Sequence, residues 1–247
     1  MDNKLTAISL FTGAGGMDIG FETAGFNVVF ANELMKEAAE TYRANHPGCN
    51  MVNDDINNVF DELSNYAGVD LVFGGPPCQG FSVAGKMDPD DERSKLIFTF
   101  LDVIEKVRPR IFVMENVKAL GILDKWEPVR KKYMDRAFSL GYNCASFILN
   151  ATEYGVSQKR ERVFFIGFKD NNDKSREKSS SRTSENWLTK TLSPNAEIIS
   201  FAISLHRARS GATIIAVVAL PEAKDERITS SILLVFPTPV GNCTIAL

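Results

Sequence analysis

The sequence predicts an α/β protein built on a doubly wound, mostly parallel sheet. Short runs that are apolar throughout alternate with longer segments in which apolar residues recur at helical spacing. Strands of a parallel sheet are apolar on both faces, because the connecting helices cover both sides of the sheet. The alternation extends from residue 1 to about residue 168 of the 247 residues. We expect ligands to bind at the carboxyl ends of these strands.

Each element of the alternation is assigned from its own pattern. Apolar runs predict the strands Thr6–Phe11, Val28–Ala31, Leu71–Phe73, Ile111–Met114 and Val163–Phe168. Helical spacing predicts the helices Met35–Asn45, Ser94–Val107 and Pro128–Leu140, and one more that begins near Met17. A further strand is expected before Asp55.

The composition changes after the last of these strands. Residues 169–197 are polar, charged and rich in serine, which is typical of a linker. Residues 198–247 contain three short segments with β-branched residues, Ile198–Leu205, Ala212–Leu220 and Ile232–Phe236. They indicate strands without regular partner helices, so we expect an irregular or incomplete C-terminal region.

The composition also excludes several classes of protein. Hydrophobic residues make up 44% and charged residues 24% of the chain, as in ordinary globular proteins, and the net charge of −3 gives no global basic field. The four cysteines are far apart and there are two histidines, so no metal site is expected. No signal peptide and no apolar run of about 20 residues is found. We expect a cytoplasmic protein with free thiols and no membrane partner.

The glycine-rich turn after the first strand is the first chemical signal. Gly13, Gly15 and Gly16 follow the run Ala7–Phe11 and lead into a helix. Glycine lets a ligand approach the main chain closely, and the free N–H groups of a helix N-terminus favour an anion. The pattern is not a complete G-x-G-x-x-G, because Asp18 stands where the third glycine is expected. The turn therefore indicates either a nucleotide site or only a tight turn.

Two acidic residues follow the next strands. Glu33 ends the second strand about 20 residues after the glycine turn, where a doubly wound fold places an acid that binds ribose hydroxyls. The alternative is a solvated residue beside a helix N-cap. Asp55 follows the expected third strand and could reach an adenine amino group, or it could simply be an acid in a turn.

The segment GGPPCQGFS, residues 74–82, places Cys78 in a loop at the carboxyl end of a strand. Prolines stiffen this loop and glycines let it fold tightly around a substrate. A lone cysteine is most often a small core residue. The position favours a nucleophile instead, in which the thiolate is the reactive form.

Two further segments supply polar groups to the same edge. Glu115, in MENV, ends the strand Ile111–Met114, and could share a proton with a ring nitrogen of a substrate or cap the next helix. Lys159, Arg160 and Arg162 cluster before the last strand. Arginine suits a phosphate or a polar base edge, although a basic run is usually a solvated face.

In this order, GAGG, PPCQGFS, ENV and QKRERV resemble the DNA (cytosine-5)-methyltransferase family, over roughly residues 4–168. The resemblance implies a Rossmann-like catalytic domain at residues 1–168 that uses S-adenosylmethionine to methylate double-stranded DNA, in a restriction-modification system. It implies catalytic roles for Cys78, Glu115, Arg160 and Arg162, and substrate contacts by Gln79 and Ser82. It implies that the cofactor is bound by Phe11, Gly13, Gly16, Glu33, Asp55, Ile56, Pro77 and Leu96.

The resemblance stops in the tail. The family follows QKRERV with a target-recognition region, then R-x-L-T-x-R-E and a final G-N motif, and residues 169–247 hold no counterpart of R-x-L-T-x-R-E. A complementary subunit could supply target recognition, or the chain could be a truncated or frame-altered product. The alternatives in function are a relative that methylates cytosine in tRNA, and a catalytically incompetent fragment that binds cofactor or DNA.

Overall fold

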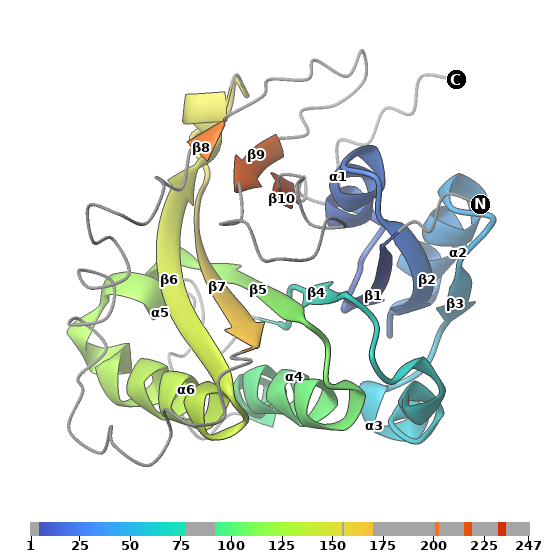
Figure 1. The fold of residues 1–247 in the computed structure, drawn as a ribbon. Coiled ribbons are helices and arrows are strands. Elements are labelled where there is room, and N and C mark those ends of the chain that lie inside the picture. The colour runs from blue at the N-terminus through green and yellow to red at the C-terminus, as the bar shows by residue number, and fades with distance from the viewer. Residues whose placement is uncertain are drawn as a thin grey trace.

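The computed structural model describes residues 5–77, 92–154 and 156–169, and the backbone of three short strands in the C-terminal region. Its main feature is a seven-stranded sheet with the order β3-β2-β1-β4-β5-β7-β6 (Figure 1). The strands are β1 (Thr6–Leu10), β2 (Asn27–Asn32), β3 (Asn50–Val52), β4 (Leu71–Gly74), β5 (Ile111–Val117), β6 (Tyr142–Asn150) and β7 (Glu161–Lys169).

The first five strands pair in parallel, whereas β7 pairs antiparallel with both β5 and β6. The prediction of a doubly wound, mostly parallel α/β sheet is therefore confirmed. All five expected strands are present, and β3 is the expected strand before Asp55. Strand β6 was not predicted. It lies at the sheet edge, and its polar residues Asn143 and Ser146 interrupt the apolar run.

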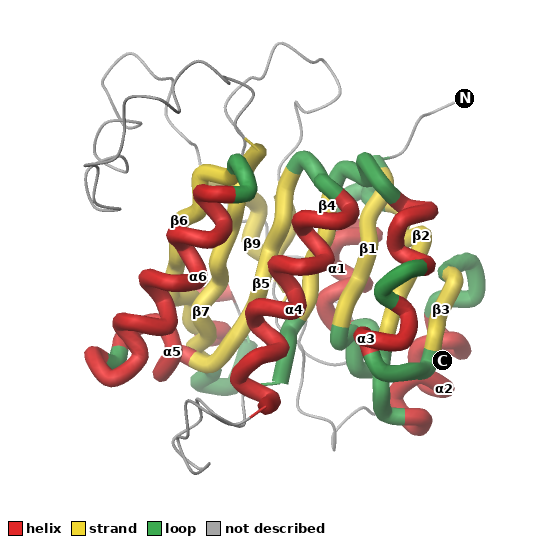
Figure 2. The backbone as a smooth tube through the Cα atoms, turned by 90° about the horizontal axis from the view of Figure 1, so that it is seen from below, coloured by secondary structure: helices red, strands yellow, loops and turns green. Residues whose placement is uncertain are grey.

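The helices are α1 (Gly16–Thr23), α2 (Lys36–Asn45), α3 (Ile56–Val59), α4 (Glu92–Val107), α5 (Lys118–Ile122) and α6 (Glu127–Ser139). The short 3-10 turns are η1 (Glu62–Tyr66), η2 (Asp124–Trp126) and η3 (Ala151–Tyr154). Figure 2 shows α3, α4 and α6 in front of the strands, with α1 and α2 behind them. The sheet therefore has helices on both faces.

Alternate residues of the central strands pack into two separate cores. Phe112 of β5 faces α4, where its ring lies 6.2 Å from that of Phe100. Phe73 of β4 belongs to the other core, with its ring 4.3 Å from that of Phe21 in α1. Successive side chains of a strand point to opposite faces, so continuous apolar runs are needed to fill both cores.

The C-terminal region contributes three short strands, β8 (Phe201–Ala202), β9 (Ile215–Val218) and β10 (Ile232–Val235). They form a separate antiparallel sheet in the order β10-β9-β8. Each strand falls within one of the three segments for which strands were expected. In the part of the chain that the structure describes, no helix is long and apolar enough to cross a membrane.

Strand β4 ends in a glycine for a steric reason. Gly74 pairs with Leu10 of β1, and a Cβ atom at Gly74 would lie 2.2 Å from the carbonyl oxygen of Leu10. No real Cβ atom approaches a main-chain oxygen so closely. The absence of a side chain therefore lets β1 and β4 meet at the point where the chain turns toward Cys78.

We expect Gly74→Ala to lower the free energy of unfolding by about 1–3 kcal/mol, the usual cost of forcing extra atoms into a packed site. Urea unfolding followed by circular dichroism measures the change. Gly48→Ala is the matched control, because nothing lies within 4 Å of the added Cβ atom at Gly48. Equal unfolding midpoints for the two variants would contradict the steric explanation.

Candidate functional site

The candidate site lies along one edge of the sheet, where the parallel strands end. The turn that includes Phe11 and Gly13 follows β1, Glu33 follows β2, and Asp55 follows β3. The segment 75–77 follows β4, and Glu115 lies near the end of β5. Because parallel strands present their carboxyl ends at one edge, the fold brings residues that are far apart in sequence to the same side.

The turn after β1 is held in an unusual backbone conformation. Phe11, Gly13 and Gly15 all have positive φ angles, of 53°, 58° and 89°. The left-handed region is costly for a residue with a side chain, such as Phe11. The N–H of Thr12 donates to the carbonyl oxygen of Asn32, 3.1 Å away, which ties the turn to the end of β2.

Glu33 joins the turn after β1 to the start of α2. Its Oε2 atom accepts a hydrogen bond of 2.8 Å from the N–H of Gly13, and its Oε1 atom accepts one of 2.8 Å from the N–H of Met35. The carboxylate is therefore fixed in position beside the glycine turn. Each of its oxygens has a second lone pair, which can accept a hydrogen bond from a hydroxyl group of a ligand.

Two asparagines that are not among the predicted site residues hold the ends of β2 and β3 together. Asn53 donates from Nδ2 to the carbonyl oxygens of Glu33 and Leu34, at 2.8 and 3.0 Å. Asn32 donates to the carbonyl oxygen of Asp54 at 2.9 Å. Their signal in the sequence is a polar amide at the end of an apolar strand, a common place for a side chain that satisfies loop carbonyls.

The remaining expected cofactor residues lie in several environments. Asp55 caps α3, and its Oδ1 atom accepts a 2.8 Å hydrogen bond from the N–H of Asn57. The side chain of Ile56 is buried in the core, so a ligand would contact its main chain instead. Leu96 and Phe11 are half-buried and pack against the same core.

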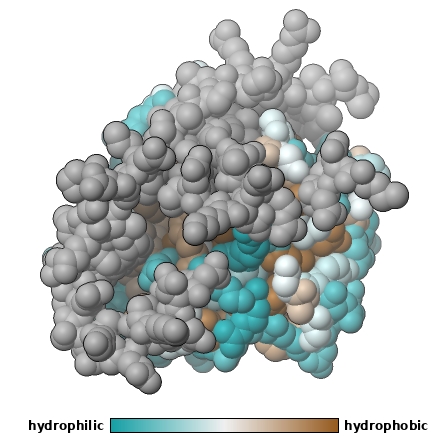
Figure 3. Space-filling view, viewed as in Figure 1, coloured by the Kyte–Doolittle hydropathy of each residue, from teal (hydrophilic) through white to brown (hydrophobic). Residues whose placement is uncertain are grey.

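Gly16, the first residue of α1, and Pro77 are half-buried. Leu34 and Met35 are exposed beside Glu33. On the face in Figure 3, apolar surface lies among hydrophilic residues in the described part of the molecule.

Glu115 and Arg162 form an ion pair at the end of β5, in which Glu115 is buried and Arg162 is half-buried. Arg162 Nε lies 2.9 Å from Glu115 Oε1, and Glu115 is 7% exposed. The pairing of β5 with β7 places Glu115 opposite Phe164, two residues from Arg162, so both side chains are on the same face. Burial raises the pKa of the Glu115 carboxyl above its usual 4.5, and the positive charges of Arg162 and Arg160 oppose that rise without cancelling it.

The segment that leads to Cys78 lies against this ion pair. A Cβ atom at Gly75 would lie 3.3 Å from Glu115 Oε2. Asn116, buried in β5, donates from Nδ2 to the carbonyl oxygen of Pro76 at 3.1 Å. Asn116 is not among the residues predicted for the site, although it follows Glu115 directly.

Cys78, Gln79 and Ser82 lie outside the described residues. Among the residues that the structure describes, no group of histidine, cysteine and acidic side chains could hold a metal ion.

A second ion pair closes the end of the same strand pair. Lys118 Nζ lies 2.6 Å from Glu161 Oε1, so residues next to β5 and at the start of β7 are joined. The hydrogen bond from Lys118 lowers the pKa of Glu161. Two glutamates on neighbouring strands therefore have pKa values shifted in opposite directions.

Comparison with known protein families gives a match over most of the chain. The model of the family described as C-5 cytosine-specific DNA methylase matches residues 5–210. The chain is 42% identical over 164 residues to the Type II methyltransferase M.FnuDI of Fusobacterium nucleatum, an alignment that covers 66% of this chain and 46% of that protein. It is 40% identical over 183 residues to M.AquIA of Picosynechococcus sp., covering 68% of this chain and 72% of the relative.

Solved structures give the same comparison in three dimensions. A DNA modification methyltransferase encoded within an E. coli prophage matches with a TM-score of 0.57 and 33% identity, over 67% of this chain and 47% of that one. DNMT2 of Spodoptera frugiperda matches with a TM-score of 0.53 and 26% identity, over 68% and 51% of the two chains. The chain spans about half the length of M.FnuDI and M.NgoPII.

The opposite pKa shifts of Glu115 and Glu161 predict opposite effects of pH on two matched variants. Burial of Glu115 as a charged group costs stability once the pH exceeds its unfolded pKa near 4.5, so Glu115→Gln should gain melting temperature relative to wild type as the pH rises. The ion pair of Glu161 stabilises the fold above that pH and is lost as the pH falls, so Glu161→Gln should lose melting temperature as the pH rises.

Melting temperatures of both variants and of wild type, measured from about pH 3 to about pH 8, give the two differences from wild type. As the pH rises, the melting temperature of Glu115→Gln minus that of wild type should increase, and the melting temperature of Glu161→Gln minus that of wild type should decrease. If both stayed constant over this range, the proposed electrostatic environments would be wrong.

Proposed function

Because the chain belongs to the C-5 cytosine-specific DNA methylase family, we propose that it is the catalytic part of a DNA (cytosine-5)-methyltransferase. The Type II relatives support a role in restriction and modification, and the description of the family supports DNA as the substrate; we propose that it is double-stranded. The observation that carries the proposal is the ion pair of buried Glu115 with half-buried Arg162, which lies against the segment that immediately precedes Cys78.

The methyl donor in this proposal is S-adenosylmethionine, bound at the turn after β1. The fit is supported by Gly13, around which there is open space where a Cβ atom would stand, and by the carboxylate of Glu33 beside it. Glu33 would accept hydrogen bonds from the ribose hydroxyls. The N-terminus of α1 at Gly16, Phe11 and the main chain near Asp55 and Ile56 would complete the site, with Pro77 and Leu96 at its border.

The donor supplies an activated methyl group, and the residues of the chain activate the acceptor. Carbon 5 of cytosine is a weak nucleophile. The thiolate of Cys78 would attack carbon 6, and the electron pair of the double bond would move into the ring while Glu115 protonates the ring nitrogen. Carbon 5 would then take the methyl group, which leaves the demethylated donor as a thioether, and the ring nitrogen would return its proton to Glu115. A base would remove the proton of carbon 5, and the thiolate would leave as the double bond re-forms.

The environment of Glu115 suits this role. A general acid must hold a proton near the pH at which it acts, and burial raises the pKa of Glu115 in that direction. Arg162 orients the carboxyl group through its 2.9 Å contact. Arg160 and Arg162 would also hold the flipped nucleotide, and Gln79 and Ser82 would contact DNA beside Cys78. Flipping a base out of the duplex costs a few kcal/mol, which such contacts help to offset.

Recognition of a target sequence is proposed to come from a complementary subunit. The catalytic motifs lie before residue 169, and residues 169–247 hold no counterpart of the motif R-x-L-T-x-R-E. Reading a DNA sequence requires several side chains placed in a groove. The alternative substrate, tRNA, uses the same chemistry and is separated from DNA by the assay below.

We expect Cys78→Ser to abolish methyl transfer while S-adenosylmethionine still binds, because the hydroxyl is a far weaker nucleophile than the thiolate. Transfer of labelled methyl groups to duplex DNA and to tRNA measures activity, and calorimetry measures cofactor binding. Cys144→Ala is the matched control, since Cys144 lies in the edge strand β6 and packs in the core on the side of α4 and α6. Turnover of the serine variant at the wild-type rate would exclude the proposed nucleophile, and transfer to tRNA alone would replace DNA as the substrate.

The chain alone should methylate DNA slowly and with little sequence preference. Adding the product of an adjacent reading frame that carries the missing motifs should increase both the rate and the preference. The measurement is transfer of labelled methyl groups to duplexes of different sequence. The chain alone is compared with the chain plus the added protein. Robust sequence-specific methylation by the chain alone would contradict the proposal that a complementary subunit supplies recognition.

A further inference from the structure

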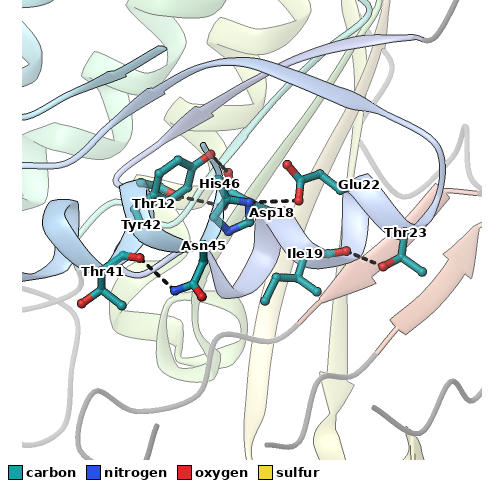
Figure 4. A network of polar contacts seen from close by, with 9 residues as sticks. All are labelled: Thr12, Asp18, Ile19, Glu22, Thr23, Thr41, Tyr42, Asn45 and His46. Atoms are coloured by element: carbon teal, nitrogen blue, oxygen red, sulfur yellow. Dashed lines mark hydrogen bonds and ion pairs between the residues drawn. The ribbon is translucent and has the colours of Figure 1, made fainter. Parts of the chain in front are cut away.

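A carboxylate is buried directly behind the turn after β1. Asp18, in the first turn of α1, is fully buried, although a carboxylate is costly to remove from water. Its Oδ2 atom accepts a 2.7 Å hydrogen bond from the hydroxyl of Thr12, and its Oδ1 atom accepts a 2.9 Å bond from the hydroxyl of Tyr42 (Figure 4). Asp18 therefore connects the turn to helix α2.

The imidazole of His46 lies beside this carboxylate. Its ring stacks on that of Tyr42, with the centroids 4.4 Å apart and 25° between the planes. Its Nδ1 atom lies 2.9 Å from Glu22 Oε2, at the other end of α1 (Figure 4). Its Nε2 atom is buried and has no hydrogen-bond partner among the described residues.

The two stacked rings press against the main chain of Gly15. A Cβ atom at Gly15 would lie 2.4 Å from His46 Nε2 and 2.9 Å from Tyr42 Cδ2. Gly15 also has a φ angle of 89°, which favours glycine. The turn is thus supported from behind at two points, by a hydrogen bond at Thr12 and by ring contact at Gly15.

An ordinary core does not need this arrangement. Replacing buried charges by well-packed apolar residues is often neutral or stabilising. Strained backbone persists where its surroundings over-determine it, and such strain is common where ligands bind. Here the buried carboxylate of Asp18 lies behind a turn in which Phe11, which has a side chain, has a positive φ angle of 53°.

We propose that Asp18, Tyr42 and His46 are positioning residues that hold the turn of residues 12–15 in the conformation that binds the methyl donor, without contacting it. That the ligand is S-adenosylmethionine rests on the proposed function. That the three residues fix the conformation of the turn does not depend on it. The three residues set the affinity for the donor through the shape of the main chain. They have no part in the chemistry at the cytosine.

The test compares two variants that remove one hydroxyl each from a buried tyrosine. Tyr42→Phe removes the hydrogen bond to Asp18. Tyr133→Phe removes a buried hydroxyl that has no hydrogen-bond partner among the described residues. Tyr42→Phe should weaken S-adenosylmethionine binding in calorimetry about ten-fold, the scale of a lost hydrogen bond to a charged group. It should raise KM for the donor with kcat unchanged, and Tyr133→Phe should change neither.

Amide hydrogen exchange at residues 12–15, measured without ligand, tests the turn directly. Exchange should be faster in Tyr42→Phe and in Asp18→Asn, which keeps the size of the side chain, while the rest of the sheet exchanges as in wild type. Glu33→Ala is the positive control for a direct loss of affinity.

Unchanged amide exchange at residues 12–15 in Tyr42→Phe and Asp18→Asn would overturn the proposal. If wild type binds S-adenosylmethionine, unchanged affinity in both of these variants would overturn it too. If wild type bound no S-adenosylmethionine, the proposed function would fail, and the exchange rates alone would decide whether the three residues position the turn.

Discussion

Strands β5 and β7 pair antiparallel, and their register determines which charges meet at the site. Glu115 lies opposite Phe164, so the side chain of Arg162 projects from the same face two positions away. The next strand along the sheet from β5 is β4, which runs parallel to it and ends at Gly74. An acid, a guanidinium and the segment preceding Cys78 are therefore brought together by main-chain hydrogen bonding. A shift of one residue in this register would move Arg162 to the opposite face.

The turn between β1 and α1 is held from two sides. On the side of β2, the carboxylate of Glu33 accepts a hydrogen bond from the N–H of Gly13. On the side of α1 and α2, Asp18 accepts a hydrogen bond from the hydroxyl of Thr12, and the ring of His46 contacts Gly15. The turn between β1 and α1 is thus fixed before any ligand arrives. Preorganisation of this kind spares a ligand the entropic cost of ordering the loop.

The sequence alone was sufficient for the architecture and for one side of the site. Apolar runs such as Leu71–Phe73 must fill two cores, so their pattern identifies the parallel strands directly. The place of Glu33 beside the glycine turn follows from its distance along the chain. The edge strand β6 was missed because it has one neighbour and tolerates polar residues.

The contacts between distant segments could not be predicted. Asp18 read as a departure from a glycine pattern, whereas its carboxylate supports the turn. The pairing of Arg162 with Glu115 depends on an antiparallel register that periodicity does not reveal. Asn116 shares this limit, because its acceptor is the carbonyl oxygen of Pro76, 40 residues away.

The division of the interior into two cores has a consequence for protein engineering. The groups that support the turn after β1 belong to α1 and α2, on one face of the sheet. The packing of α4 and α6, around Phe100 and Tyr133, is on the other face, and the strands separate the two. Substitutions around Tyr133 in α6 lie across the sheet from Asp18 and Tyr42, so their effects on stability are expected to add to effects at the turn. A designer could therefore raise thermal tolerance from the α6 side, whereas α4 carries Leu96 and borders the binding edge.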